Sequence, residues 1–290
     1  MKPAPFRYIR ALSVDDALAA LAGHGDDAKV LAGGQSLIAL MNLRLIRPAV
    51  LVDINRLADI AYVRQENGTL AIGALTRQSA VESSDLIAHQ CPLMGEAIRF
   101  VAHRPIRNRG TIGGNLAHAD PTSELPAVAV ALGATFVAQS HKSQRTIAAD
   151  NFFVAPLTTR LGADELLTEV RVPVWPAGQG WSFMEVSPRA GDYAPVGVAA
   201  TLRAADGVCR AARLVYSGVG PRPIRVDKAE QMLVGRPSRE ATFREVAEIA
   251  AEQVDPTSDF HATAEYRRDL VRVLTRRALV VALDRCQKGA

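Results

Sequence analysis

The sequence has 290 residues, a length sufficient for about two domains. Its 48% hydrophobic and 22% charged residues are typical of a soluble globular protein and exclude a disordered or fibrous chain. The net charge of +4 is modest, and the densest basic run, residues 103–109, contains no Phe, Trp or Tyr. We therefore expect no nucleic-acid partner.

The apolar stretches and the cysteines exclude further classes of protein. The longest nearly apolar stretch, from Pro126 to Ala138, is too short to cross a bilayer, and the N-terminus lacks the apolar core of a secretion signal. Cys91, Cys209 and Cys286 lie far apart and form no CxxC pair, which disfavours a zinc or iron–sulfur site held by this chain alone. We expect a cytoplasmic protein with no membrane span and no metal site.

The first elements along the chain form a small parallel unit. Ser13 and Asp16 resemble a capping box that opens a helix. A short apolar strand is predicted over residues 29–32, a short helix over 37–44 and a second buried strand over 49–54. Strand, tight turn, helix and strand indicate a βαβ-like unit with a right-handed crossover.

The pattern after Asn55 predicts an antiparallel hairpin. Residues 61–65 and 69–74 alternate in hydrophobicity around Asn67-Gly68, a strong turn signal. Helices and strands then follow, with a polar, glycine-rich passage over 104–120 between them. The helices are predicted over 76–89, 92–103 and 124–132, and the strands over 135–138, 145–148 and 165–172. A linker rich in proline and glycine, residues 173–178, ends this part.

The remainder of the chain predicts a sheet followed by helices. Strands are expected over residues 181–186, 194–203 and 208–218, with Asp206-Gly207 as the last turn. Helices are expected over residues 226–234, 239–254 and 264–286. A run of strands followed by a run of helices is typical of the α+β class.

Two glycine pairs are the main chemical signals. They stand in Ala32-Gly33-Gly34-Gln35-Ser36 and in Thr111-Ile112-Gly113-Gly114-Asn115. Paired glycines permit positive φ and let backbone N–H groups approach an anion closely. Two such segments, each with a neighbouring hydroxyl or amide, suit a pyrophosphate held from both sides.

Either pair alone has an ordinary explanation, since tight turns are rich in glycine. Neither segment fits GxGxxG, and GxxxxGK[ST] is absent from the sequence. The sequence therefore disfavours a Rossmann nicotinamide enzyme and a P-loop NTPase.

Longer motifs around these glycines resemble one family. AGGQSLIALMNLR (Ala32 to Arg44) and IRNRGTIGGNLAHADPTSELPAV (Ile106 to Val128) resemble the two flavin-binding motifs of the FAD-binding medium subunits of molybdenum hydroxylases. This family includes the carbon monoxide dehydrogenase medium chain and the xanthine dehydrogenase FAD-binding subunit. RAGDYA (Arg189 to Ala194) and ELLTEV (Glu165 to Val170) match two more of its segments, so the resemblance covers essentially the whole chain.

The resemblance implies a fold and its division. Residues 1–176 are expected to form an FAD-binding domain of the vanillyl-alcohol oxidase (PCMH) type, with subdomains of about 1–55 and 56–176. Residues 177–290 are expected to form a C-terminal domain like that of the carbon monoxide dehydrogenase flavoprotein, a three-stranded antiparallel sheet with a helix bundle.

The resemblance also implies roles for individual residues. The cofactor-binding set is Ala32, Gly33, Gly34, Gln35, Ser36, Thr111, Ile112, Gly113, Gly114, Asn115, Glu124, Leu167, Asp192 and Tyr193. The two glycine segments would hold the pyrophosphate of FAD. Glu124 would contact the flavin end of the cofactor, Leu167 would pack beside the isoalloxazine ring, and Asp192 would fix the loop that carries Tyr193. Tyr193, near the ring face by N5, is the candidate catalytic residue. The carbon monoxide dehydrogenase chain of this family has a lysine near the position that corresponds to Glu185. The acidic residue here departs from that pattern and does not supply its positive charge to the flavin.

Each of these residues also has a plain structural interpretation. Tyr193 could cap a sheet edge, and Glu124 could be a charge favoured at the N-terminus of its helix. His103 and His118 lack a partner spaced for a catalytic triad and are interpreted as polar loop residues. The arginines at 104, 107 and 109 offset phosphate charge, face a partner subunit, or form a solvated surface.

The function implied by the resemblance is electron transfer by a bound FAD. The chain would receive electrons from 2Fe–2S clusters of a small partner subunit and pass them to an external acceptor. A large partner subunit would carry the molybdenum cofactor, within a heterotrimer. The alternatives are a free-standing FAD-dependent oxidoreductase that acts directly on a small molecule, and a module that has lost FAD and serves as a binding or assembly protein.

Overall fold

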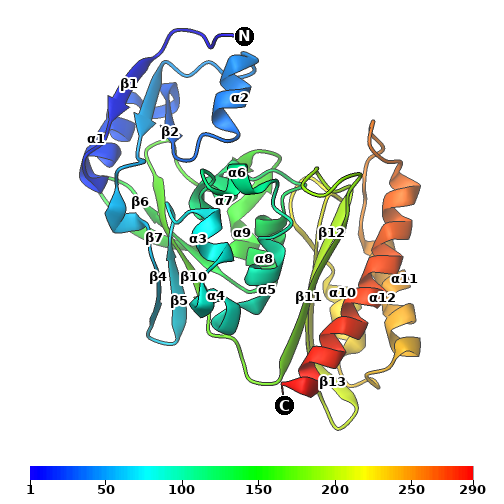
Figure 1. Ribbon diagram of the computed structural model, residues 1–290. Helices are drawn as coiled ribbons and strands as arrows, with labels where there is room; N and C mark the ends of the chain where they lie inside the picture. Colours follow the sequence, from blue (N-terminus) through cyan, green and yellow to red (C-terminus); the bar gives the residue numbers. More distant parts are fainter. Residues whose placement is uncertain (290) are drawn as a thin grey trace.

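The computed structural model describes residues 1–289, arranged as three parts in chain order (Figure 1). A three-stranded sheet of order β1-β3-β2 forms the first part, and a five-stranded sheet of order β4-β5-β10-β6-β7 forms the second. A four-stranded sheet of order β11-β12-β13-β14 forms the third and is covered by the C-terminal helices. The α+β class is thereby confirmed.

The first part is a parallel unit. Its strands are β1 (Arg7–Arg10), β2 (Ala28–Leu31) and β3 (Val50–Asp53), and its helices are α1 (Val14–His24) and α2 (Leu37–Asn42), with a 3₁₀ turn, η1 (Gly25–Asp27), after α1. β2 and β1 each pair in parallel with β3, so the predicted parallel βαβ unit is confirmed, and β1 is an additional strand. The Ser13–Asp16 capping box is present, and Ala17, Leu18 and Leu21 of α1 are buried against the sheet.

The second part pairs its strands antiparallel around β10. The strands are β4 (Val63–Glu66), β5 (Thr69–Gly73), β6 (Thr135–Gln139), β7 (Gln144–Ala148) and β10 (Leu166–Pro173). The helices are α3 (Gln78–Glu82), α4 (Asp85–Gln90), α5 (Pro92–Ala97), α6 (Arg104–Arg107), α7 (Ile112–His118), α8 (Glu124–Ala131) and α9 (Ala149–Phe152). The short elements η2 (Ala58–Ile60), β8 (Phe153–Ala155) and β9 (Thr158–Thr159) complete it.

Three predictions of local structure in this part were wrong, and the first is the helix expected over residues 92–103, which ends at Ala97. The helix expected over residues 76–89 is interrupted, because Ser84 leaves the helical conformation and caps α4 through the N–H of Ile87. The glycine-rich passage over residues 104–120 is not a loop but contains α6 and α7. Thr111 begins α7 by accepting a hydrogen bond from the N–H of Gly114, so the second glycine pair lies in a helical turn.

The C-terminal part consists of β11 (Gln179–Val186), β12 (Val196–Ala205), β13 (Val208–Ser217), β14 (Ile224–Arg225), α10 (Asp227–Leu233), α11 (Glu240–Gln253) and α12 (Ala264–Lys288). The predicted three-stranded sheet has a fourth strand. β14 has no recognisable sequence pattern because it is only two residues long, and its pairing with Val215 and Tyr216 is a tertiary contact. All four strands are antiparallel, as expected.

The C-terminal sheet is covered on both faces (Figure 1). Side chains on a strand alternate between the two faces. Val196, Val198 and Leu202 of β12 therefore pack with the C-terminal helices, whereas Ala199 joins the core of the second part. The guanidinium of Arg213 donates to the carbonyl of Val130 in α8 at 2.7 Å, and this fixes the sheet against that helix. This shared core, with the hydrogen bond from the N–H of Gly218 to the carbonyl of Pro121 at 2.9 Å, holds the C-terminal sheet beside the loop that follows α7.

Candidate functional site

The first glycine segment follows β2 and presents unpaired backbone donors. Gly34 has a φ of +73°, and Ser36 precedes α2 without capping it through its side chain. None of the N–H groups of Gly33, Gly34, Gln35 and Ser36 has an acceptor among residues 1–289, while the side-chain amide of Gln35 donates to the carbonyl of Gly33 at 3.2 Å. Consecutive free N–H groups of this kind suit an anion.

The second glycine segment has a different local role from the one we expected. Its N–H groups from Ile112 to Asn115 already donate within the protein, to Thr76, Ala74 and the side chain and carbonyl of Thr111. Neither Gly113 nor Gly114 has positive φ. A Cβ atom on Gly113 would overlap Ala74, and one on Gly114 would lie 2.6 Å from Thr111 Oγ1. The expectation of a second loop of free N–H donors was wrong, because these glycines instead permit close packing.

The two glycine segments nevertheless lie against each other. A Cβ atom on Gly33 would overlap the carbonyl oxygen of Arg109 and would lie 2.9 Å from Gly110 Cα. A Cβ atom on Gly114 would lie 3.7 Å from that of Ala32. Residues that are almost eighty positions apart in the chain thus form one surface, as a pyrophosphate-binding arrangement requires.

A cavity of about 690 Å³ opens beside this surface. Gly33, Gly34 and Gln35 line it together with the guanidinium-bearing side chains of Arg77 and Arg109. Burial, followed by the repulsion of Arg109, lowers the pKa of Arg77 from its ordinary value. The cavity therefore combines free N–H groups with two basic side chains, which favours an anionic ligand.

Ser123 and Glu124, where α8 begins, adjoin the second glycine segment. The hydroxyl of Ser123 donates to the side chain of Asn115 at 3.0 Å. Glu124 is 8% exposed at the start of α8. Burial raises its pKa to about 7, against the lowering effect of its own N–H and of Ser123, and Asp120 raises it further.

Glu185 on β11, in the third part, is near enough to Glu124 of the second part for the two carboxylates to repel each other. Burial, followed by repulsion from Glu124, raises the pKa of Glu185 to about 8. Its Oε2 atom and the hydroxyl of the fully buried Ser217 have no hydrogen-bond partner within the described residues. Both flank Gly197, whose added Cβ would lie 2.6 Å from Ser217 Oγ and 3.6 Å from Glu185 Cβ. Two buried polar groups without a hydrogen-bond partner therefore lie close together on the C-terminal sheet.

The loop that carries Asp192 and Tyr193 closes over the segment between α5 and α6. A Cβ atom on Gly191 would lie 2.6 Å from His103 Cε1 and 3.0 Å from the carbonyl carbon of Ala102. Asp192 and Tyr193 are both exposed. Desolvation and the carboxylates of Asp120 and Glu124 raise the pKa of Tyr193. These carboxylates are thus near enough to Tyr193 to disfavour its ionisation.

Leu167 lies in the buried core of the second part. It is 4% exposed on β10, next to a β-bulge between Leu167 and Glu169. At this bulge, the carbonyl of Thr168 accepts from the N–H of Ala74, the residue against which Gly113 packs. Leu167 is therefore close to the second glycine segment through the backbone.

The arginines near the second segment divide into different roles. Arg107 is 8% exposed and forms a two-pronged ion pair with Glu82, at 2.9 and 3.0 Å, and it also donates to the carbonyls of Val101 and Ala102. These contacts hold Ala102 at a φ of +45°. Arg107 is thus a structural residue, whereas Arg109 lines the cavity and Arg104 is exposed.

Neither metal ligands nor a membrane helix is found in residues 1–289. In this range no three or more His, Cys, Asp or Glu side chains come together as metal ligands would. The helices of the same range include none with the length and apolar character of a bilayer span.

Comparison with known families decides the identity of this arrangement. Residues 4–175 match the family described as the FAD binding domain in molybdopterin dehydrogenase, and residues 181–282 match the CO dehydrogenase flavoprotein C-terminal domain. The chain belongs to the FAD-binding medium subunits of the molybdenum hydroxylases.

Individual relatives are similar to this chain over nearly the whole of their lengths. This medium subunit is 44% identical to caffeine dehydrogenase subunit beta of Pseudomonas sp. (strain CBB1), over 98% of this chain and 97% of the relative. It is 43% identical to 6-hydroxypseudooxynicotine dehydrogenase complex subunit alpha of Paenarthrobacter nicotinovorans, over 99% and 97%. A carbon monoxide dehydrogenase structure from Hydrogenophaga pseudoflava superimposes with a TM-score of 0.96, at 36% identity over 99% of this chain and 100% of the other.

FAD is therefore the cofactor of this medium subunit, which is an oxidoreductase subunit. The site fits the cofactor on two observations. The free N–H groups from Gly33 to Ser36, beside two arginines, suit its diphosphate. The close approach of Gly33 to Arg109 brings the two glycine segments together beside that cavity.

Sequence reasoning missed several residues of this site. Asn55 and Arg77 line the cavity, and Ser217 lies beside Glu185 on the neighbouring part of the sheet. These residues belong to none of the matched motifs. A lone polar residue that follows a buried strand, as Asn55 follows β3, is the one signal that could have indicated the first of them.

Proposed function

We propose that this subunit accepts electrons singly from iron–sulfur clusters of a small partner subunit and passes them in pairs, through FAD, to an external acceptor. A large partner subunit carries the molybdenum cofactor in the same heterotrimer. The supporting observation is that the two glycine segments form one surface suited to FAD. The three cysteines of the chain, by contrast, are buried, free and far apart in the sequence. Clusters that need several thiolates would lie on another polypeptide. We also assign the complex to the cytoplasm.

The cofactor would be held by the residues of both glycine segments. The free N–H groups of Gly33, Gly34, Gln35 and Ser36 would bind the diphosphate. The surface beneath the diphosphate would be formed by Ala32 and by Thr111, Ile112, Gly113, Gly114 and Asn115. When bound, FAD exchanges electrons between one-electron donors and two-electron acceptors.

At the other end, Glu124, Leu167, Asp192 and Tyr193 would surround the flavin. Glu124 retains a proton close to neutral pH, since burial raises its pKa to about 7, and can therefore donate a hydrogen bond. Tyr193 would lie against the ring, and the turn in which Asp192 N–H donates to the carbonyl of Arg189 at 3.1 Å orients it.

We further propose a division into residues 1–176, with subdomains of about 1–55 and 56–176, and residues 177–290. Support comes from the irregular backbone over residues 174–178 and from the change of sheet on either side of it.

The test is purification of the native chain with its partners, followed by a visible spectrum and metal analysis. The proposal expects flavin absorbance together with iron and molybdenum in the co-purifying polypeptides. Bound flavin without any iron- or molybdenum-containing partner would favour a free-standing flavoenzyme. Absence of flavin binding, even after FAD is added, would favour a module that has lost its cofactor.

A further inference from the structure

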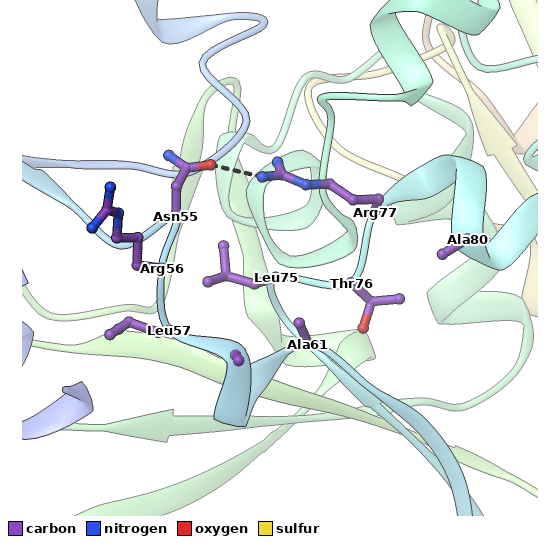
Figure 2. Close-up of a pocket in the computed structure, with 9 residues that line it drawn as sticks. Asn55, Arg56, Leu57, Ala61, Leu75, Thr76, Arg77 and Ala80 are labelled. Atoms are coloured by element: carbon purple, nitrogen blue, oxygen red, sulfur yellow. Dashed lines mark hydrogen bonds between the residues drawn. The ribbon is translucent and has the colours of Figure 1, made fainter. Parts of the chain in front are cut away.

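Asn55 and Arg77 form a hydrogen-bonded bridge between the first and second parts. The guanidinium of Arg77 donates to Asn55 Oδ1 at 2.9 Å, and Figure 2 shows the two side chains pointing toward each other. Asn55 follows β3, and Arg77 precedes α3. Together they separate the large cavity beside the glycine segments from a smaller one of about 330 Å³.

Each end of the bridge binds the backbone of one glycine segment. The amide of Asn55 donates to the carbonyl of Ala32 at 2.6 Å, immediately before Gly33. Arg77 also donates to the carbonyl of Arg109, against which Gly33 packs. A continuous line of hydrogen bonds thus runs from Ala32 through Asn55 and Arg77 to Arg109.

The bridge is itself anchored. Asp53 Oδ1 accepts from both the backbone N–H and the side-chain amide of Asn55, at 2.9 and 2.7 Å. Burial acts to raise the pKa of Asp53, but hydrogen bonds from Tyr8 and Asn55 outweigh it and lower the pKa. Asp53 is therefore ionised at neutral pH and fixes the orientation of the Asn55 amide, with its oxygen toward Arg77.

The first glycine segment depends on such an anchor because its own N–H groups have no acceptor in residues 1–289. A segment without internal hydrogen bonds loses conformational freedom when it binds a ligand, and that loss reduces affinity. Holding the Ala32 and Arg109 carbonyls in place fixes the direction of the donors before the ligand arrives.

We propose that Asn55 and Arg77 are positioning residues that hold the two glycine segments at the separation required by the diphosphate of FAD. This inference rests on the assignment of the site to FAD. The residues act on the backbone of the segments, and neither is assigned a part in electron transfer.

The experiment measures the dissociation constant of FAD from the flavin-stripped full-length chain, by flavin fluorescence, at a temperature where circular dichroism shows every variant to be folded. The variants are Asn55→Ala, Arg77→Met and the double variant. The matched control is Arg56→Ala, because Arg56 is exposed, adjoins Asn55 and lines only the smaller cavity (Figure 2).

We expect each single variant to raise the dissociation constant about tenfold or more. The dissociation constant of the double variant should be no higher than that of the weaker-binding single variant, since removing either residue breaks the same line of hydrogen bonds. Arg56→Ala should bind FAD within about twofold of the wild type. Single variants within twofold of the wild type, or fully additive losses, would overturn the proposal.

Two further variants separate positioning from charge and from folding. Arg77→Lys keeps the charge but not the forked geometry, so affinity should stay low and the deficit should persist at high salt. Full recovery by lysine would show that charge alone matters and would overturn the proposal. Asn55→Asp keeps an acceptor for Arg77 but cannot donate to Ala32. It should therefore bind as weakly as Asn55→Ala, and it serves as the test if the alanine variant does not fold.

Failure of the FAD assignment gives a different result. In that case the wild-type chain itself would not bind FAD. Failure of the positioning role alone would leave FAD binding by the wild type intact, with single variants within twofold of it, with fully additive losses, or with full recovery by Arg77→Lys.

Discussion

Gly33 shows how much of the site depends on one missing methyl group. A Cβ atom at this position would overlap the carbonyl oxygen of Arg109, so any side chain forces the two glycine segments apart. The backbone on both sides carries the groups proposed to bind FAD. The constraint at Gly33 is therefore steric and does not come from positive φ, which among the four paired glycines only Gly34 adopts.

We predict that Gly33→Ala lowers the affinity for FAD by at least about tenfold, since the segments must separate to admit the methyl group. Titration of the stripped chain with FAD measures this loss. Gly95→Ala is the matched control: its Cβ would lie 3.6 Å from the nearest atom, an ordinary contact, in α5. Undiminished affinity of Gly33→Ala for FAD would contradict the proposal that the two glycine segments together bind the cofactor.

The buried carboxyls of Glu124 and Glu185 make stability depend on pH. Burial raises the pKa of Glu124 to about 7 and that of Glu185 to about 8, above the ordinary value near 4.5. The folded state thus holds these protons more tightly than the unfolded state. The two protonated carboxyls therefore contribute fully to the stability of the folded state below about pH 4.5, and this contribution is lost as the pH rises through 7 to 8.

We therefore predict that the melting temperature of the flavin-free wild type falls between pH 5 and pH 9 more steeply than that of a Glu124→Gln, Glu185→Gln double variant. The glutamines stay neutral and carry no such dependence. Glu66→Gln, on the exposed side of β4, should follow the wild type. Thermal unfolding across this range is the measurement, and equal slopes for the wild type and the double variant would refute the raised pKa values.

At the scale of elements, Glu96 joins a helix of the second part to the C-terminal part. It lies on α5, accepts from the indole N–H of Trp181 at 3.1 Å and from the N–H of Phe183 at 3.2 Å, and forms an ion pair with Arg285 of α12. The Arg285 guanidinium also lies 4.9 Å from the Trp181 ring centroid. One carboxylate thus connects α5, β11 and α12.

Replacing Glu96 with alanine should lower the free energy of unfolding by about 2 kcal/mol, because three donors lose a charged acceptor. Urea denaturation measures the change. Asp284→Ala removes an exposed ion pair with Lys288 at 2.7 Å and should change stability by less than about 0.5 kcal/mol. A Glu96 variant as stable as this control would show that the connection contributes little.

For the whole molecule, the FAD site that we propose draws on all three parts. The first glycine segment belongs to the first part, α7 and Glu124 to the second, and Glu185 and Tyr193 to the third. A ligand that contacts all of them stabilises the folded chain by mass action.

We predict that FAD at about 100 times its dissociation constant raises stability by about 2.7 kcal/mol and slows amide exchange at Gly33–Ser36. Hydrogen exchange with and without FAD checks this prediction. Amides in the middle of α12, remote from the cavity, should change only to the extent of global stabilisation. If FAD slowed amide exchange only in α12 and not at Gly33–Ser36, the proposed position of the FAD site would be wrong.

The sequence alone was sufficient for the class, most elements and the ligand chemistry. Hydrophobic periodicity and turn residues are local properties, so the parallel crossover, the Asn67-Gly68 hairpin and the long C-terminal helix could be predicted. The resemblance of two glycine-containing motifs to flavin-binding segments indicated FAD as the cofactor, and the family match confirmed it.

Only the tertiary structure decided which groups are free to act. The N–H groups of Ile112–Asn115 resemble those of Gly33–Ser36 in sequence, yet they already donate to Thr76, to Ala74 and to Thr111 of their own helix. Asn55, Arg77 and Ser217 belong to no motif, and Glu185 acquires its raised pKa from burial and from a carboxylate 61 positions earlier in the chain. Hydrogen-bond occupancy, burial and charge proximity depend on packing between distant segments, and a linear pattern does not encode them locally.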